Sequence, residues 1–208
     1  MSIVQRAKNI ILKPTDEWNI ISREPATISG ILGGYAAILA AIPMAAGILF
    51  TGALGISGAG LLGGGAIPLG FEAIAAMSVI GYILSLITLY LMGIIVNSVS
   101  PSFNGKSDLH QSLKLLTYAS TPTWLAGLVG WIPILGALVS FAANAYVVYL
   151  IYLGLQPVLG VPKEKVAGFT VVIVLIYVVL SLIVSGIIIG LLFSTFFAGG
   201  ATGALSGA

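Results

Sequence analysis

Five long runs of uncharged, mostly apolar residues constrain the fold of this chain more than any other feature. They are residues 28–50, 73–96, 115–131, 134–155 and 166–197. A helix of about 20 residues, rising roughly 1.5 Å per residue, crosses the hydrocarbon core of a bilayer. Because lipid offers the backbone no hydrogen-bond partners, we expect each run to form a continuous transmembrane helix. The composition agrees, since 59% of residues are hydrophobic and only 7% are charged.

The segment between the first two runs, residues 51–70, is also uncharged, but we do not expect it to cross the membrane. It holds eight glycines in twenty residues. Each glycine weakens a helix by about 1 kcal/mol relative to alanine. Pro68 would also leave no turn before the next run. We therefore predict a loop here.

With five spans, all eight basic residues fall on one side of the membrane. They are Arg6, Lys8, Lys13 and Arg23 before the first span, Lys106 and Lys114 after the second, and Lys163 and Lys165 after the fourth. Such asymmetry identifies the cytoplasmic face, so residues 1–27 should lie inside and a flexible tail, residues 198–208, outside. The sequence thus predicts an all-α, polytopic integral membrane bundle of five transmembrane helices.

The N-terminal segment predicts a short amphipathic helix ahead of the bundle. Ile3, Val4, Ala7, Ile10 and Ile11 recur at helical spacing, and Pro14 ends the pattern. Arg6, Lys8 and Lys13 should then turn toward anionic headgroups while the apolar face enters the lipid. We expect Trp18 to act as an interfacial anchor beside them.

No group of residues predicts catalysis, a cofactor or a metal site. The spans contain no ionisable residue apart from tyrosine, although a proton relay or an ion-coupled carrier normally needs one. Asp108 and His110 form too small a ligand set for a metal, and Glu72 suits the start of a helix. The chain has no cysteine, no P-loop and no dinucleotide fingerprint. We therefore expect neither an enzyme nor a nucleic-acid-binding protein.

Small polar residues enter the membrane along helical stripes. The candidates for a polar interior are Ser85 and Thr88 in the second run, Tyr118 and Pro122 in the third, and Ser140 and Asn144 in the fourth, with Tyr177, Ser181 and Ser185 forming a further stripe in the fifth. Pro122 frees the carbonyl of Tyr118, so we expect a kink there with a neighbouring hydroxyl or water taking up the lost bond. One interpretation is close helix packing through small residues and hydrogen bonds of about 1 kcal/mol each. The alternative is a narrow polar path or a headgroup pocket.

Three segments carry a likeness to a known family: LKPTDEWNIISREP, LLTYASTPTW and YVVYLIYLGLQPVLGVPKEKVAGFTVVIVLIYVV. They resemble the prokaryotic branch of the Yip family, the Ypt/Rab-interacting membrane proteins. The matching positions are Pro14, Trp18, Tyr118, Pro122, Tyr149, Gly154, Pro162 and Lys165. The resemblance implies the five-span layout with a cytoplasmic N-terminus. In eukaryotes it implies vesicle traffic and binding of Rab-type GTPases, but the long cytoplasmic N-terminal domain of that pattern is not found here.

Two functions of different classes follow from these patterns. The first is a non-enzymatic factor in a prokaryotic plasma membrane that organises the membrane or binds partners, through anionic headgroups, other proteins or a second copy of itself. The alternative is a transporter or channel for a small solute, an ion or a lipid. Liposome flux assays distinguish the two.

Overall fold

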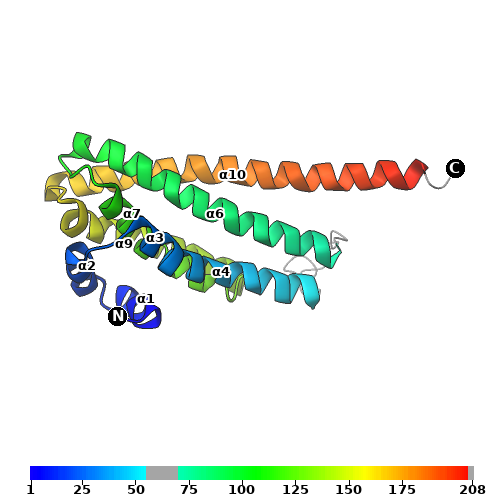
Figure 1. Ribbon diagram of the computed structural model, residues 1–208, viewed down its shortest axis with the longest axis horizontal. Coiled ribbons are helices and arrows are strands. Elements are labelled where there is room, and N and C mark those ends of the chain that lie inside the picture. The colour runs from blue at the N-terminus through cyan, green and yellow to red at the C-terminus, as the bar shows by residue number, and fades with distance from the viewer. Residues whose placement is uncertain (55–69, 206–208) are drawn as a thin grey trace.

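A computed structural model describes the backbone of residues 1–54 and 70–205, and the side chains within these ranges up to Leu191. All regular structure in these ranges is helical (Figure 1). Two short helices, α1 (Ile3–Leu12) and α2 (Pro14–Arg23), precede the long ones, and Pro14 separates them as expected. Most of the loop predicted over residues 51–70 lies outside the described residues.

Four helices in the described ranges are long and apolar enough to cross a membrane. The first, Ile28–Ala53, is continuous through α3 (Ile28–Ile31), η1 (Leu32–Ala36), α4 (Ala37–Ala46) and η2 (Gly47–Ala53). The others are α6 (Phe71–Val99), which continues through η3 (Ser100–Phe103), then α9 (Leu135–Leu159) and α10 (Lys163–Leu205). The predicted runs 28–50, 73–96, 134–155 and 166–197 are therefore confirmed as long apolar helices.

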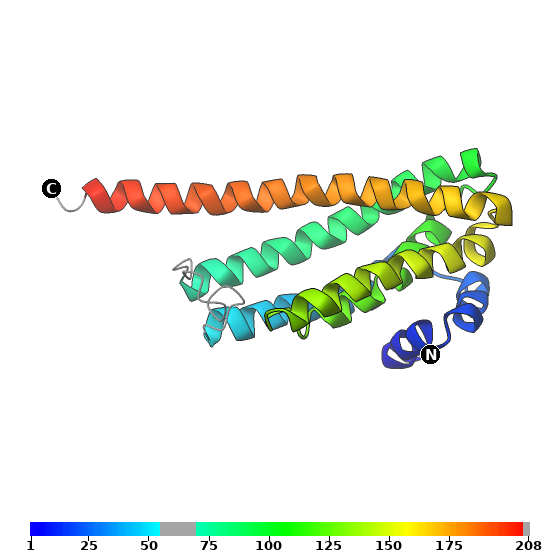
Figure 2. The same cartoon turned by 180° about the vertical axis from the view of Figure 1, so that it is seen from behind.

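The last helix is much longer than a bilayer requires. Its 43 residues correspond to about 64 Å at 1.5 Å per residue, against a hydrocarbon core of about 30 Å. It continues to Leu205, past the end expected at residue 197. Figures 1 and 2 show α10 running beyond the other helices and diverging from them toward the C-terminus.

The expectation of a continuous helix over the third run, residues 115–131, is wrong. The chain there forms α7 (Leu109–Ala119) and α8 (Thr121–Ala126), followed by turns over residues 127–134. The break falls at Ser120, two residues before Pro122, and the Thr121 hydroxyl donates to the freed Tyr118 carbonyl at 2.8 Å. The expected kink and its hydroxyl partner are therefore confirmed. The turns reach the far end of the first span, because Trp131 stacks on Phe50 with ring centroids 4.3 Å apart.

The helices pack most tightly around α7, which contacts α6, α9 and the first span. Gly93 of α6 lies so close to α7 that a Cβ atom on it would come within 2.4 Å of Leu113. Without a hydrophobic drive between helices in lipid, close approach at such small residues holds a bundle together. Residues at the same end of the bundle, among them Leu115, Leu155 and Phe169, are fully buried.

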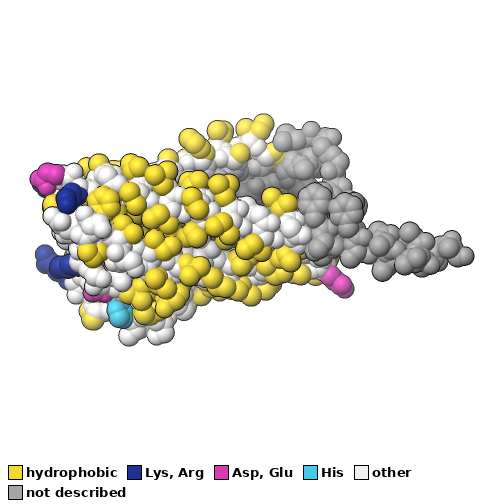
Figure 3. Space-filling view, turned by 90° about the horizontal axis from the view of Figure 1, so that it is seen from above, with side chains coloured by type: hydrophobic (Ala, Val, Ile, Leu, Met, Phe, Trp, Pro, Cys, Tyr) yellow, Lys and Arg dark blue, Asp and Glu magenta, His cyan; other side chains and the backbone are white. Residues whose placement is uncertain are grey.

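The basic residues gather at one end of the molecule, as Figure 3 shows for the face it presents. The loops after α6 and after α9 meet there. The Lys106 amide donates to the Leu159 carbonyl at 2.7 Å, and Lys165 Nζ donates to Asn104 Oδ1 at 3.1 Å. Loops far apart in the sequence therefore form one basic end.

Candidate functional site

The first candidate site is the place where α1 and α2 dock against the basic end of the bundle. Arg6 of α1 is only 6% exposed and forms an ion pair with Glu17 of α2, which is 2% exposed. Arg6 Nη2 also donates to Glu24 Oε1 at 2.6 Å, and its guanidinium carbon lies 5.6 Å from the centre of the Tyr118 ring. Asn9 Nδ2 donates to the other Glu17 oxygen at 2.9 Å. We call Arg6, Glu17 and Glu24 the docking cluster.

The docking cluster holds one guanidinium against two carboxylates, and the buried Lys114 beside Glu24 supplies the second positive charge, which makes the burial of these groups tolerable. Burial alone would lower the pKa of Arg6, but the hydrogen bond and charge of Glu24 and the charge of Glu17 raise that pKa above its ordinary value. Arg6 therefore stays charged, and a guanidinium satisfies several acceptors at once because its donors form a fixed fork. The docking cluster joins the two N-terminal helices to each other and, through Tyr118, to the bundle.

Lys114 of α7 completes the docking from the bundle side. It is 2% exposed, and its Nζ donates to the backbone carbonyls of Ile21, at 3.1 Å, and Glu24. These carbonyls lie at the C-terminal end of α2, where a helix favours positive charge. Burial lowers the pKa of Lys114, and the charges of Glu24 and Asp108 oppose this shift.

An aromatic side chain also joins α2 to the bundle. Trp18 is fully buried, and a Cβ atom on Gly154 of α9 would lie 2.9 Å from its ring. On α1, the Ile11 carbonyl accepts a hydrogen bond of 2.6 Å from the Tyr146 hydroxyl. Polar and apolar contacts thus hold the N-terminal helices as part of the folded protein.

Two expectations about the interfacial anchors are therefore wrong. Arg6 does not turn away from the apolar face of α1, because Glu17 and Glu24 on the neighbouring helix neutralise it inside the protein. Trp18 is buried against α9, where Gly154 leaves room for its ring, and so it does not face outward from the protein. Lys8 and Lys13 are exposed, as the sequence suggested.

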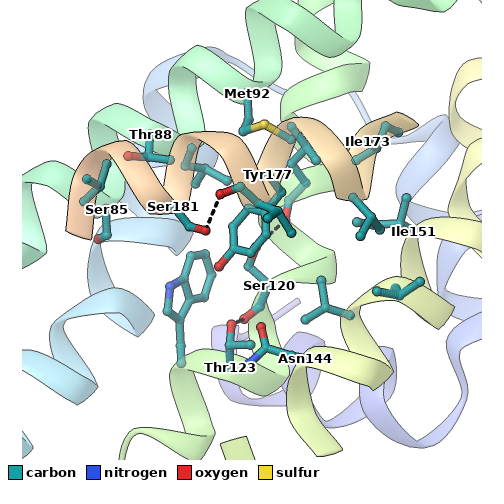
Figure 4. A pocket seen from close by; sticks show the side chains of 18 of the residues that line it. Ser85, Thr88, Met92, Ser120, Thr123, Asn144, Ile151, Ile173, Tyr177 and Ser181 are labelled. Carbon is teal, nitrogen blue, oxygen red and sulfur yellow. Dashed lines mark hydrogen bonds between the residues drawn. The ribbon is translucent and has the colours of Figure 1, made fainter. Parts of the chain in front are cut away.

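The second candidate site is a cavity of about 400 Å³ between α6, α7, α8, α9 and α10 (Figure 4). It brings together Ser85, Thr88 and Asn144, three of the predicted polar residues. Its wall also includes Tyr177 and Ser181 of α10. The remaining lining is mostly apolar, and no charged side chain takes part.

The other predicted interior residues lie elsewhere. Tyr118 packs edge-on against Tyr35, with ring centroids 4.6 Å apart, and Pro122 is buried in the first turn of α8, just after the helix break. Ser140 does not line the cavity, although its carbonyl accepts a 2.8 Å hydrogen bond from Asn144 Nδ2. Sequence reasoning gave no role to Trp124 of α8, which does line the cavity, because an isolated tryptophan in an apolar run carries no positional signal.

No metal site is found among the described residues, where no three His, Cys, Asp or Glu side chains come together. Asp108 instead caps α7, since its Oδ1 accepts from the backbone amides of His110 at 2.9 Å and Gln111 at 3.2 Å. This is the usual arrangement for an aspartate at a helix N-terminus. The Asp108 and His110 pair therefore has a structural explanation.

Comparison with known proteins agrees with the resemblance in the sequence. The Yip1 domain matches residues 8–186. The chain is 30% identical over 160 residues to the inner membrane protein YohC of Escherichia coli strain K12. The aligned residues make up 76% of this chain and 80% of YohC. YohC of E. coli O6:H1 strain CFT073 matches to the same extent. No solved structure matches the chain. On this family match and the long apolar helices, the chain is a membrane-embedded protein that belongs to the Yip family.

Proposed function

We propose that this protein is a non-enzymatic membrane-organising factor whose docked N-terminal helices gather anionic lipid at the cytoplasmic face of a prokaryotic plasma membrane. One observation carries the proposal: α1 is fixed to the bundle by its inner face and presents a basic and apolar outer face. Val4 is 78% exposed and Leu12 is 65% exposed, and exposed Lys8 lies between them on the same side of the helix. Protein partners or a second copy could be recruited at the same end.

The chemistry of this outer face suits the headgroup layer. Apolar side chains enter the boundary between headgroups and acyl chains, and each nearby lysine attracts anionic lipid by about 1 kcal/mol. Figures 1 and 2 place α1 along the flank of the bundle near its basic end, which is where the headgroup layer of the cytoplasmic leaflet would lie. Because the docking cluster holds α1 in place, the face is already ordered before lipid binds.

The proposal includes five crossings with the N-terminus inside and the C-terminus outside. Support comes from the gathered basic end and from the contact of Trp131 with Phe50, which implies that the broken third run also reaches the far side. The chain has no cysteine, so single cysteines can report its topology. Cysteines replacing Ser107 and Glu164 should be protected from an impermeant thiol reagent outside cells, whereas one replacing Glu72 should react. Labelling at Ser107 from outside would overturn the five-crossing topology.

The lipid-gathering function is tested by energy transfer in vesicles. A donor dye on Leu12→Cys should transfer more energy to an acceptor-labelled anionic lipid than to an equally labelled neutral lipid at the same mole fraction. The preference should vanish in Lys8→Gln/Lys13→Gln and should be absent for a donor on Glu72→Cys at the opposite end. Equal transfer to both lipids in the parent protein would refute the proposed function.

The presence of the cavity favours a second candidate function, transport of a neutral solute or lipid. Its polar side chains come from four helices, as a solute path would require. Its end toward the basic side is closed by Met92, Leu116 and Ile151, which are at most 6% exposed, so no open path continues there. We therefore expect reconstituted protein to show neither solute flux nor lipid scrambling. A flux that Asn144→Leu abolishes would reverse this ranking.

A further inference from the structure

The cavity between α6, α7, α8, α9 and α10 has a property that the proposed lipid-gathering function does not use. Five of its hydroxyl groups, those of Ser85, Thr88, Ser120, Thr123 and Ser181, donate their hydrogen atoms to nearby backbone carbonyls. Thr88 donates to the Leu84 carbonyl at 2.7 Å, and Thr123 donates to the Ser120 carbonyl at 2.7 Å. Ser181 donates to the Val178 carbonyl at 2.8 Å.

A hydroxyl group has one donor hydrogen and two acceptor lone pairs. Once its hydrogen is committed to the backbone, its oxygen can only accept. Asn144 donates one of its two Nδ2 hydrogens to the Ser140 carbonyl, which leaves its Oδ1 as an acceptor and its second amide hydrogen as a donor. Figure 4 shows Thr123 and Asn144 together on one side of the cavity, with Tyr177 pointing toward them from α10. The oxygens of Thr88, Thr123, Ser181 and Asn144 are therefore acceptors for an occupant that can donate.

The cavity wall has no charged side chain, which favours an uncharged occupant. An unpaired ion in an apolar site is strongly disfavoured. Ser85 lies near the middle of α6 and Asn144 in the central part of α9, so the acceptors sit at mid-depth along the bundle. A volume of about 400 Å³ is within the usual range for small-molecule sites.

The shape of the cavity indicates where an occupant enters. At its closed end Met92 and Ile173 are 3% and 0% exposed. At its mouth Tyr177 is 47% exposed, Val178 44% and Val148 37%. These mouth residues belong to α9 and α10, and α10 diverges from the bundle toward its C-terminus (Figure 2). In a membrane this mouth faces hydrocarbon, so the occupant comes from the lipid phase.

We propose that this cavity binds a neutral single-chain amphiphile from the bilayer, with a hydroxyl group that donates to the acceptors around Thr88, Thr123 and Asn144. Long-chain alcohols and monoacylglycerols belong to this class. The alkyl chain lies along the apolar wall and leaves through the mouth between α9 and α10. The cavity is separate from the outer face of α1. The proposal that it binds an amphiphile can therefore hold or fail independently of the proposed lipid-gathering function.

Trp124 provides a direct reporter because it lines the cavity and bromine quenches indole fluorescence on contact. The protein in lipid nanodiscs is titrated with a long-chain alcohol brominated beside its hydroxyl group, and in parallel with the brominated alkane of equal length. We expect saturable quenching by the alcohol and only a linear rise with the alkane. The saturable part should disappear in Trp124→Phe and remain in Trp131→Phe.

A matched pair of threonines tests the acceptors themselves. Thr88 and Thr170 each donate to the carbonyl four residues earlier, but Thr170 does not line the cavity. Thr88→Val combined with Asn144→Leu should weaken the saturable quenching about tenfold, through loss of two hydrogen bonds, while Thr170→Val leaves it unchanged.

If the Thr88→Val/Asn144→Leu variant fails to fold, a competition experiment on the parent protein still tests whether the cavity binds the alcohol. An unbrominated alcohol of equal length should restore the quenched fluorescence, and the corresponding alkane should not. Equal saturable quenching by alcohol and alkane, or no saturable quenching at all, would overturn the proposal.

Discussion

Replacing Arg6 by leucine tests whether the docking cluster holds the N-terminal helices on the bundle. The change removes the cation and leaves the Glu17 carboxylate, which is 2% exposed, without its charge partner. Breaking a buried ion pair in this way costs about 3–5 kcal/mol. Glu24 adds little to this cost, because its side chain is 41% exposed and water can solvate it. The docked state of α1 and α2 should be destabilised by about that amount.

Hydrogen exchange of the α2 amides in nanodiscs measures this loss. Exchange through local opening reports the free energy between the docked and open forms. Since about 1.4 kcal/mol corresponds to a factor of ten, Arg6→Leu should speed exchange in α2 by roughly two to three and a half orders of magnitude. Lys8→Leu is the matched control, because Lys8 is exposed on the opposite side of α1. In this variant the α2 amides should exchange at the parent rate.

The double variant Arg6→Leu/Glu17→Leu separates charge imbalance from loss of packing. Replacing a buried ion pair by apolar residues of similar size is often neutral or stabilising. We therefore expect exchange in the double variant to return close to the parent rate. If Arg6→Leu leaves exchange unchanged, or if the double variant exchanges as fast as the single one, the electrostatic account of docking is wrong.

Three further predictions concern the bundle and its polar contacts. Gly154→Ala should destabilise the protein in detergent by about 1–3 kcal/mol through overpacking. Gly81→Ala should not, because its Cβ atom would meet nothing within 4 Å. Equal thermal midpoints for the two variants would contradict this prediction. Thr121→Val removes the hydroxyl that donates to the Tyr118 carbonyl and should cost about 1–3 kcal/mol in the same assay, and no change would count against that bond. The lowered pKa of Lys114 means that the docked state releases this proton before the open state, so docking should strengthen as pH rises toward 10.5. Hydrogen exchange should show this strengthening relative to Lys114→Arg, which stays protonated, and parallel pH profiles would refute it.

The long helices could be predicted because hydrocarbon allows few solutions for a backbone. The runs at residues 28–50 and 73–96 became helices with nearly the expected limits, and Pro122 broke the third run as its chemistry requires. The same reasoning failed for residues 127–131, where turns replace the expected helix. Gly127 and Gly130 lie in this stretch and Pro133 follows it, and these residues favour turns over a continued helix.

The docking cluster could not be predicted from one helix at a time. A helical projection of α1 assigns Arg6 to water or headgroups because it contains no information about α2. Glu17 and Glu24 become partners only when α2 folds back on α1, a tertiary event that no local pattern specifies. Buried Lys114 has the same explanation, since its acceptors are carbonyl groups of Ile21 and Glu24, and every sequence contains carbonyl groups.

The structure also explains why half of the charged residues fall within the first 24 positions. Orientation of a membrane protein depends on lysine and arginine near the spans, whereas aspartate and glutamate contribute little. Topology alone therefore gives no reason for Glu17 and Glu24, and their ion pairs with Arg6 supply one. Lys8 and Lys13 remain exposed on the same short segment. Because the inward charges are neutralised within the protein, the outward lysines act as the net charge of α1, so loss of Arg6 should disturb the position of α1 while loss of Lys8 and Lys13 should change only its attraction for lipid.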